Sequence, residues 1–89
     1  MTKEEATSKA RKDLANRLGI SESEVTEQSV TETEFPDMAL GAAAAGEMSG
    51  QMLTKGWKIQ LKADGQSYEY RADKNQLRLY KFKGKSFKI

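Results

Sequence analysis

The chain has no cysteine and no histidine among its 89 residues. Without cysteine it forms no disulfide and offers no thiol nucleophile, and without either residue the usual zinc sites of proteins are excluded. We therefore expect no metal and no cofactor. The sequence also lacks an apolar run of the ~20 residues that cross a bilayer, so we expect no membrane span. The polar start, Thr2 to Glu5, gives no sign of a signal peptide.

Large apolar residues and net charge are both scarce. Only 15 of the 89 residues are Leu, Ile, Val or Phe, which raises the question of disorder. The net charge of +2 argues against disorder, because disordered chains usually combine low hydrophobicity with strong net charge. The length suits a single domain, 1–89. The charge is uneven, since residues 1–37 carry a net charge of −4 and residues 38–89 a net charge of +6.

The N-terminal residues have the pattern of an amphipathic helix. Thr2 and Glu5 are spaced as a capping box, in which each side chain bonds the backbone N–H of the other residue. Gly19 suits the left-handed residue that follows a helix. Small and apolar residues recur every four positions at Ala6, Ala10, Leu14 and Leu18. We predict a helix over about 3–18 that lies close against a sheet.

A polar strand and an unusual loop follow the helix. Residues of about 25–35 are rich in Val, Thr, Glu and Ser, which is typical of an exposed strand. Val25 and Val30 would face opposite sides of that strand unless a bulge intervenes. Residues 36–53 have too many glycines for a stable helix and too many alanines for a strand, so we predict a loop. Ordered loops of this length are uncommon and often functional.

The rest of the chain alternates apolar and polar residues, which predicts a meander over about 55–89. Asp64-Gly65 marks a hairpin turn, and the segment after Gly84 extends the last strand following a break. We therefore predict an α+β fold with one N-terminal helix packed on a three- to four-stranded antiparallel sheet, in the order α-β-loop-β-β-β. The aromatic residues expected in the core under the helix are Trp57, Tyr68 and Tyr70.

No set of side chains has a recognisable catalytic pattern. The acids cluster on the polar strand, where a solvated face is expected rather than a buried carboxylate pair. Gly41 and Gly46 have the spacing of a phosphate loop, but Glu47-Met48 stands where that loop requires Lys and Ser or Thr. We expect a non-enzymatic binding or regulatory module.

The basic C-terminal segment suggests an alternative function, which is nucleic-acid binding. Its bases alternate with aromatic rings that can stack on nucleotides. The segment comprises Arg78, Tyr80, Lys81, Phe82, Lys83, Lys85 and Lys88. We favour a structural interpretation, in which lysines on an edge strand discourage aggregation, or in which this strand pairs with the acidic first strand. A domain near neutrality lacks the strongly basic balance of such binders.

From Phe35 onward the chain resembles a family of small, mostly uncharacterised bacterial domains that are often found in exported proteins or lipoproteins. The matching residues are Phe35-Pro36-Asp37, Leu40-Gly41, Gly46, Gln51, Gly56-Trp57, Gly65 and Tyr68-x-Tyr70, and the likeness covers most of residues 10–72. The resemblance implies an exported parent protein and no particular activity. The order of elements also resembles PepSY domains, which are associated with protease inhibition or regulation outside the cytoplasm.

The chain departs from that family inside the loop. The family's cysteine and both of its prolines fall on Ala42, Ala43 and Ala45, and its loop tyrosine falls on Ser49. If the family acts through that cysteine or that rigid turn, this member has lost the feature.

We predict that loop 36–53 and its flanking aromatic residues form a contact surface, because function often resides in loops held by a rigid scaffold. The candidate residues are Phe35, Pro36, Asp37, Leu40, Gly41, Gly46, Gln51, Met52 and Trp57. Three loop methionines, Met38, Met48 and Met52, either form an adaptable apolar surface or fold the loop onto the sheet edge. We expect a monomer whose partner is a protein or peptide rather than a nucleic acid.

Overall fold

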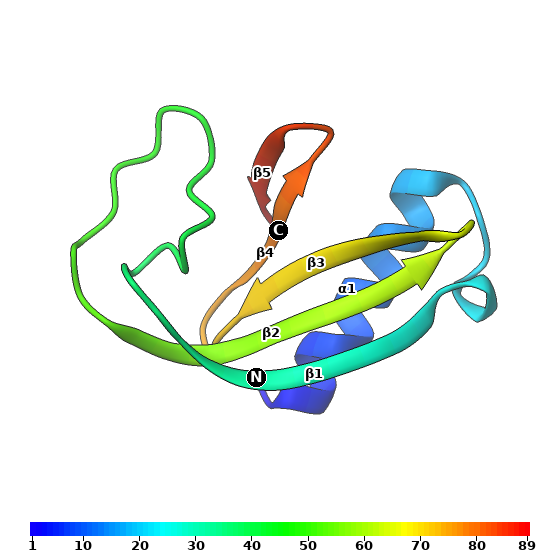
Figure 1. The fold of residues 1–89 in the computed structure, drawn as a ribbon, viewed down its shortest axis with the longest axis horizontal. Coiled ribbons are helices and arrows are strands. Elements are labelled where there is room, and N and C mark those ends of the chain that lie inside the picture. Colours follow the sequence, from blue (N-terminus) through cyan, green and yellow to red (C-terminus); the bar gives the residue numbers. More distant parts are fainter.

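The computed structural model describes all residues, 1–89, and has one helix against one face of an antiparallel sheet (Figure 1). The elements are α1 (Lys3–Leu18), the short 3₁₀ helix η1 (Glu22–Glu24), β1 (Thr26–Phe35), β2 (Thr54–Ala63), β3 (Gln66–Ala72), β4 (Leu77–Phe82) and β5 (Lys85–Lys88). The spatial order is β1-β2-β3-β4-β5. The predicted α+β class is confirmed. No helix has both the length and the apolar character that crossing a membrane requires.

Local sequence signals set both ends of α1. The Thr2 hydroxyl accepts a hydrogen bond from the backbone N–H of Glu5 at 3.1 Å, and the Glu5 carboxylate accepts one from the N–H of Thr2 at 2.7 Å. These bonds to Thr2 lower the pKa of Glu5. Gly19 follows the helix with a φ of 69°, the left-handed conformation that glycine adopts without steric cost. The predicted capping box and helix end are therefore confirmed.

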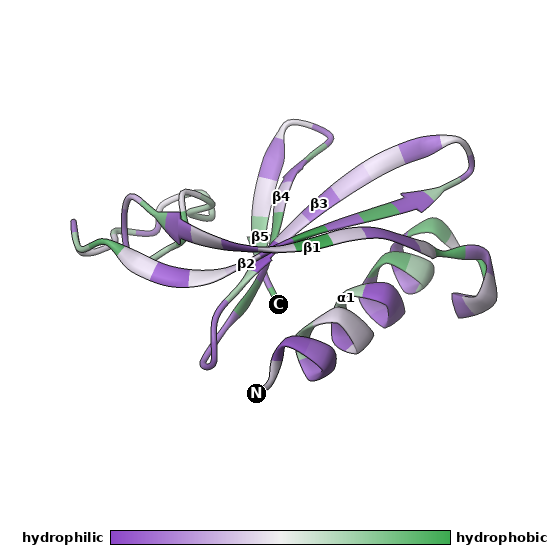
Figure 2. Ribbon diagram, turned by 60° about the horizontal axis from the view of Figure 1, so that its bottom comes forward, coloured by the Kyte–Doolittle hydropathy of each residue, from purple (hydrophilic) through white to green (hydrophobic).

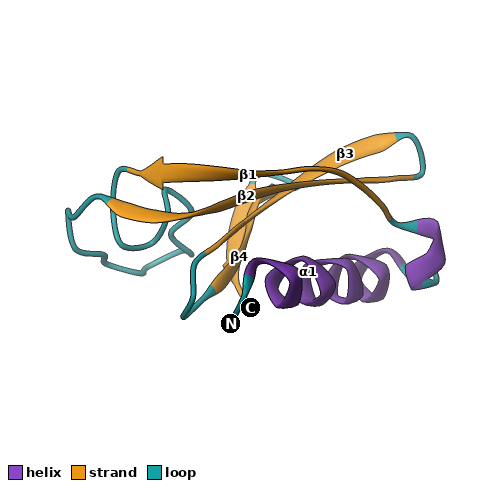
Figure 3. Ribbon diagram, turned by 90° about the horizontal axis from the view of Figure 1, so that it is seen from below, coloured by secondary structure: helices purple, strands orange, loops and turns teal.

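The main core lies between α1 and one face of the sheet. Figures 2 and 3 show α1 lying along that face. Its buried residues are Ala6, Ala10, Leu14, Ala15, Val25, Ile59, Leu61, Ala63, Tyr70, Ala72, Leu77 and Leu79. Small alanines let the helix approach the larger side chains of the sheet. Of the aromatic residues predicted there, Tyr70 is fully buried, whereas Trp57 and Tyr68 are half-buried at its border.

The sheet has five strands, so the prediction of three to four is corrected. Gly84 does not simply interrupt the last strand. Lys83 and Gly84 have φ angles of 52° and 84° and connect β4 to β5, where Phe82 pairs with Lys85. Two consecutive residues with positive φ are the signature of a tight hairpin turn. The sequence signal was weak because lysine rarely adopts this conformation.

A bulge in β1 places both of its valines toward the core. The register with β2 shifts between Glu27 and Ser29. Val25 is fully buried, and Val30 is half-buried against the same core. The bulge that the valine spacing required is therefore present. β1 and β5 are the two edges of the sheet, so the acidic and basic strands do not pair with each other.

The strand register assigns side chains to two faces, because residues paired across antiparallel strands share a face. Ile59, Tyr70 and Leu79 form one cross-strand row, and all three are buried under α1. The next row consists of Lys58, Arg71 and Arg78, so these residues lie on the opposite face. That second face carries the loop between β1 and β2.

A hydrogen bond through the core joins α1 to β3. The Tyr70 hydroxyl donates to the Asp13 carboxylate at 2.6 Å, and the same oxygen accepts from Arg17 Nε at 2.7 Å. Burial, together with the nearby Asp13 carboxylate, raises the pKa of Tyr70 far above its usual value, so the hydroxyl remains a donor.

We predict that Tyr70→Phe lowers the free energy of unfolding by about 1.5–2 kcal/mol, because a hydrogen bond to a charged acceptor is lost. Tyr68→Phe is the matched control, since its hydroxyl bonds only the exposed Gln66 side chain, and we expect a change below about 0.5 kcal/mol. Urea unfolding followed by circular dichroism measures both values. Equal losses in the two variants would contradict the assigned role of the Asp13 contact.

Candidate binding surface

Two neighbouring arginines hold the loop of residues 36–53 on the face of the sheet opposite α1. Arg71 of β3 and Arg78 of β4 are cross-strand partners. Their side chains are only 14% and 4% exposed. Each guanidinium donates hydrogen bonds to backbone carbonyls of the loop. The loop is therefore attached to the sheet at two adjacent points.

Arg71 lies between aromatic rings and the loop backbone. Its Nη1 donates to the Leu40 carbonyl at 2.9 Å, and its Nε donates to the Glu69 carboxylate at 2.7 Å. The guanidinium carbon lies 3.6 Å from the ring centroid of Tyr80 and 5.4 Å from that of Phe35. Flat contact with aromatic rings suits arginine because its guanidinium is planar and weakly hydrated.

Arg78 makes a two-pronged ion pair with the loop residue Glu47. Nη1 and Nη2 donate to the two carboxylate oxygens at 2.5 and 2.8 Å. Nε donates to the Gln76 side chain at 2.6 Å, and the Ala42 carbonyl lies 3.4 Å from Nη1. The bonds from Arg78, and then the backbone N–H of Ala44, lower the pKa of Glu47 from 4.5 to about 2. Glu47 is therefore ionised at neutral pH.

The first turn of the loop is shaped by Asp37. One carboxylate oxygen of Asp37 accepts from the backbone N–H of Ala39 at 2.9 Å and from that of Gly41 at 3.0 Å. This turn places Leu40 and Gly41 at φ angles of 59° and 66°. An ideal Cβ at Gly41 would lie 2.6 Å from Arg71 Nη1, so glycine is needed here for conformation and for space.

The inner side of the loop buries a second apolar cluster, separate from the main core. It consists of Phe35, Ala39, Leu40 and Ala42, each exposed by 2% or less. Phe35 has the same parity in β1 as Thr33 and Thr31, which face away from α1 because Val30 faces it. The loop thus serves as a small second layer on the sheet.

The outer side of the loop carries most of the exposed large apolar side chains. They are Met38 (49% exposed), Met48 (95%), Met52 (64%) and Leu53 (67%), and the only other one is Ile89. An open hollow of about 520 Å³ is lined by Met38, Met52, Leu53 and Trp57 among others. Of the two interpretations of the methionines, exposure favours the adaptable surface.

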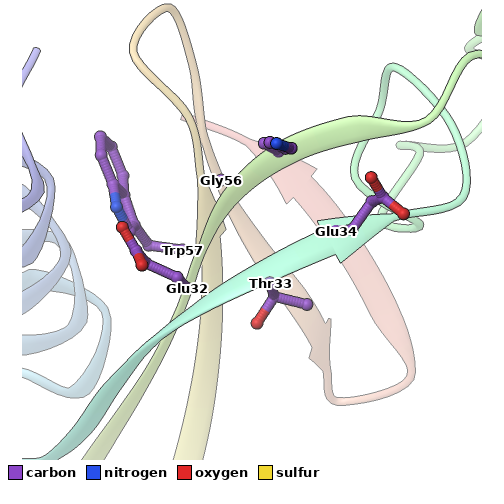
Figure 4. Close-up of a pocket in the computed structure, with 6 residues that line it drawn as sticks. Glu32, Thr33, Glu34, Gly56 and Trp57 are labelled. Atoms are coloured by element: carbon purple, nitrogen blue, oxygen red, sulfur yellow. The ribbon is translucent and has the colours of Figure 1, made fainter.

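A second hollow, of about 460 Å³, is formed by residues of β1 and β2, and Trp57 lines it as well as the first hollow. It is lined by Glu32, Thr33, Glu34, Lys55, Gly56 and Trp57. Figure 4 shows the Glu32 carboxylate beside the indole of Trp57, with Thr33 pointing to the opposite face. Trp57 therefore borders both hollows and connects the loop surface with the β1 edge.

The candidate residues divide into a buried frame and an exposed rim. Phe35 and Leu40 are buried, and Asp37 and Gly41 shape the first turn. The exposed or half-buried members are Pro36, Gly46, Gln51, Met52 and Trp57. Sequence reasoning named Met38 only as one of two alternatives and missed Leu53 as a surface residue. It also missed Arg71, Arg78 and Glu47 as anchors of the loop. The sequence contains one signal for the Glu47 anchor, because Glu47 is the only charged residue between Asp37 and Lys55.

The basic segment proposed as an alternative surface is only partly accessible. Arg78 is buried in its ion pair, and Tyr80 packs against Arg71. Phe82 lies 5.9 Å from Tyr68 and 6.4 Å from Phe87, measured between ring centroids. The exposed members are Lys81, Lys83, Lys85 and Lys88. Nucleic-acid binding stays a prediction that now depends on four lysines.

The fold and the site define a small α+β domain in which an anchored loop presents apolar side chains. The chain belongs to the family described as Domain of unknown function (DUF8738), whose sequence profile matches residues 7–80. No curated protein and no solved structure is significantly similar to the chain. The match confirms the expected relationship to an uncharacterised small domain.

The Arg78–Glu47 pair makes stability depend on pH. The pKa of Glu47 is about 2 in the folded protein and near its ordinary value of 4.5 in the unfolded chain, so the pair stabilises the fold above pH 4.5 and this contribution is lost as pH falls toward 2. We predict that the stability difference between wild type and Glu47→Gln is largest at pH 7 and shrinks between pH 4.5 and 2. Urea unfolding at several pH values measures it. A difference that is the same at pH 2 and pH 7 would contradict the assignment.

Gly41 is expected to tolerate a side chain less well than Gly46. Both have positive φ, at 66° and 78°, but a Cβ at Gly46 meets no atom within 4 Å. Gly46→Ala should cost about 1 kcal/mol of stability through conformation alone. Gly41→Ala should cost about 1–2 kcal/mol more, because Arg71 must leave the Leu40 carbonyl. Thermal and urea unfolding of both variants give the comparison, and equal costs would show that Arg71 does not constrain this position.

Proposed function

We propose that this domain is a non-enzymatic binding module that captures a protein or peptide through the outer side of loop 36–53. The observation that carries the proposal is the combination of anchoring and exposure. Met38, Met52 and Leu53 are exposed by about half or more, while the loop that bears them is held by Arg71 and Arg78. Exposed apolar side chains that border a hollow are typical of interaction sites.

The anchoring lowers the entropic cost of binding. Both backbone polar groups of Met38 are hydrogen-bonded. Its N–H donates to the Gly50 carbonyl at 2.9 Å, and its carbonyl accepts from Gln76 Nε2 at 2.8 Å. A partner therefore meets a loop whose backbone is already ordered, and less free energy is spent on ordering it. The methionine side chains adapt to the partner's shape, since thioether chains are flexible and polarisable.

The hollow between Met52, Leu53 and Trp57 also includes charged residues of both signs, Lys55, Lys74 and Asp73. The surface therefore favours an apolar partner segment that is flanked by charged residues. The absence of histidine and cysteine supports a binding role over catalysis. The finer sequence hypotheses, an exported bacterial parent protein and a PepSY-like regulatory role, agree with such a module and stay predictions.

Truncating the exposed apolar side chains should weaken binding without unfolding the protein. We propose selecting peptides from a random displayed library on the wild-type domain and measuring their affinity for the double variant Met52→Ser/Leu53→Ser. Binding should weaken at least about tenfold, since two apolar contacts are lost. Urea unfolding should show unchanged stability, because both side chains are already solvent-exposed.

Ile89→Ser is the matched control, because Ile89 is a comparably exposed apolar residue outside the loop. It should bind the selected peptides within about twofold of wild type. Peptides that bind the double variant as tightly as wild type would refute the loop as the contact surface. If no selected peptide requires Met52 and Leu53 for binding, the loop is also refuted as the contact surface.

A further inference from the structure

The outer edge of β1 is a free sheet edge ten residues long. β1 is the first strand in the sheet order, and its only partner is β2. Apart from the buried Phe35 and the half-buried Val30 and Thr33, its residues are exposed. Every edge strand presents unpaired backbone N–H and C=O groups along its outer side. These groups can form a ladder with a further extended segment.

The usual devices that protect such an edge are missing from most of β1. No lysine, arginine or proline interrupts the strand. The bulge lies near its start, and the pairing of Ser29–Phe35 with β2 is regular. Instead the strand carries Glu27, Glu32 and Glu34. Two copies of this strand would bring like charges together, so the acids select against self-pairing.

None of these glutamates forms an ion pair within the protein. The three ion pairs of the structure are Arg17–Asp13, Arg71–Glu69 and Arg78–Glu47, and no residue of β1 takes part in them. Across the strand pair, Glu34 lies opposite Lys55, whereas Glu32 lies opposite Trp57. Glu32 therefore has an aromatic residue as its direct cross-strand partner, and Lys55, the one cation that lines the same hollow, lies opposite Glu34.

The hollow at the β1–β2 edge is lined by two carboxylates, one lysine and an indole, so its carboxylates outnumber its cations. Glu32 and the indole of Trp57 lie side by side in it (Figure 4), and Lys55 lies opposite Glu34. Gly56 also lines the hollow, and a Cβ at this position would lie 2.1 Å from the Ala72 carbonyl, so no larger residue fits there. An arginine or lysine can lay its stem and charge on the indole while its head meets the carboxylate.

We propose that an extended basic segment of a partner protein binds along β1 as an additional outer strand, with an arginine or lysine side chain between Glu32 and Trp57. Backbone pairing supplies the register, and the acids of β1 select the charge of the partner. This surface is distinct from the exposed apolar side chains of loop 36–53, so the domain has two faces for a partner that meet at Trp57.

The test uses the full chain and a fluorescein-labelled peptide with the sequence Thr-Arg-Val-Lys-Thr-Arg-Val, blocked at both ends, measured by fluorescence anisotropy at low salt. We expect saturable binding, and slower amide exchange in β1 when the peptide is bound. Glu32→Gln should weaken binding about fivefold or more. Trp57→Leu should weaken it to a similar degree. Asp64→Asn in the turn between β2 and β3, an equal change of net charge seven residues along the chain from Trp57, should stay within about twofold.

Two peptide controls separate strand pairing from general charge attraction. A peptide of the same sequence that is N-methylated at every residue keeps its charge but cannot donate to the ladder, and we expect at least about tenfold weaker binding. A peptide with glutamate in place of each arginine and lysine should not bind. Equal binding by the N-methylated peptide, equal effects of Glu32→Gln and Asp64→Asn, or no saturable binding would overturn the proposal.

Binding at the β1 edge is independent of the loop function. Met52→Ser/Leu53→Ser leaves the β1 edge intact, so this variant should bind the basic peptide within about twofold of wild type. A loss of binding in that variant would place the peptide on the loop and would overturn strand pairing along β1.

Discussion

The buried guanidinium of Arg78 is the constraint on which the arrangement of the loop depends. A charge with only 4% of its side chain exposed requires partners, because an unpaired buried charge costs several kcal/mol. Glu47 and the Ala42 carbonyl supply them from the loop, and Gln76 supplies a third contact from beside β4. The loop cannot leave the sheet without returning Arg78 to water or leaving it unpaired. Arg78 and its neighbour Arg71 therefore hold an 18-residue segment without helix or strand on the sheet, together with the contact from Gln76 to Met38.

This attachment gives the sheet two unequal coverings. On one face α1 closes the main core, and on the other face the loop closes a smaller cluster around Phe35 and Leu40. A chain of this size buries a limited fraction of its surface, so a second small cluster contributes appreciably to its stability. Neither covering extends over the outer edge of β1 or over all of Trp57. The outer edge of β1 and part of Trp57 thus stay open to solvent after both layers are in place.

The parts of the fold that could be predicted are those encoded by neighbouring residues. Thr2, Glu5 and Gly19 fix the helix ends by contacts within one turn, and the valine spacing in β1 required a bulge. The parts that could not be predicted depend on distant pairs. Arg78 and Glu47 are 31 residues apart, and only the register of β3 with β4 places Arg78 beneath the loop. From the sequence alone Arg78 was indistinguishable from the exposed lysines that follow it.

The same distinction separates the residues that hold the loop from those that it exposes. Phe35, Asp37 and Gly41 each have a structural role. Phe35 fills the second cluster, Asp37 bonds the turn, and Gly41 leaves room for Arg71. Met38 and Leu53, in contrast, are exposed. A substitution at either exposed residue changes what the loop contacts without disturbing what holds it. The buried residues therefore specify the support of the loop, and the exposed side chains are those that the support leaves free.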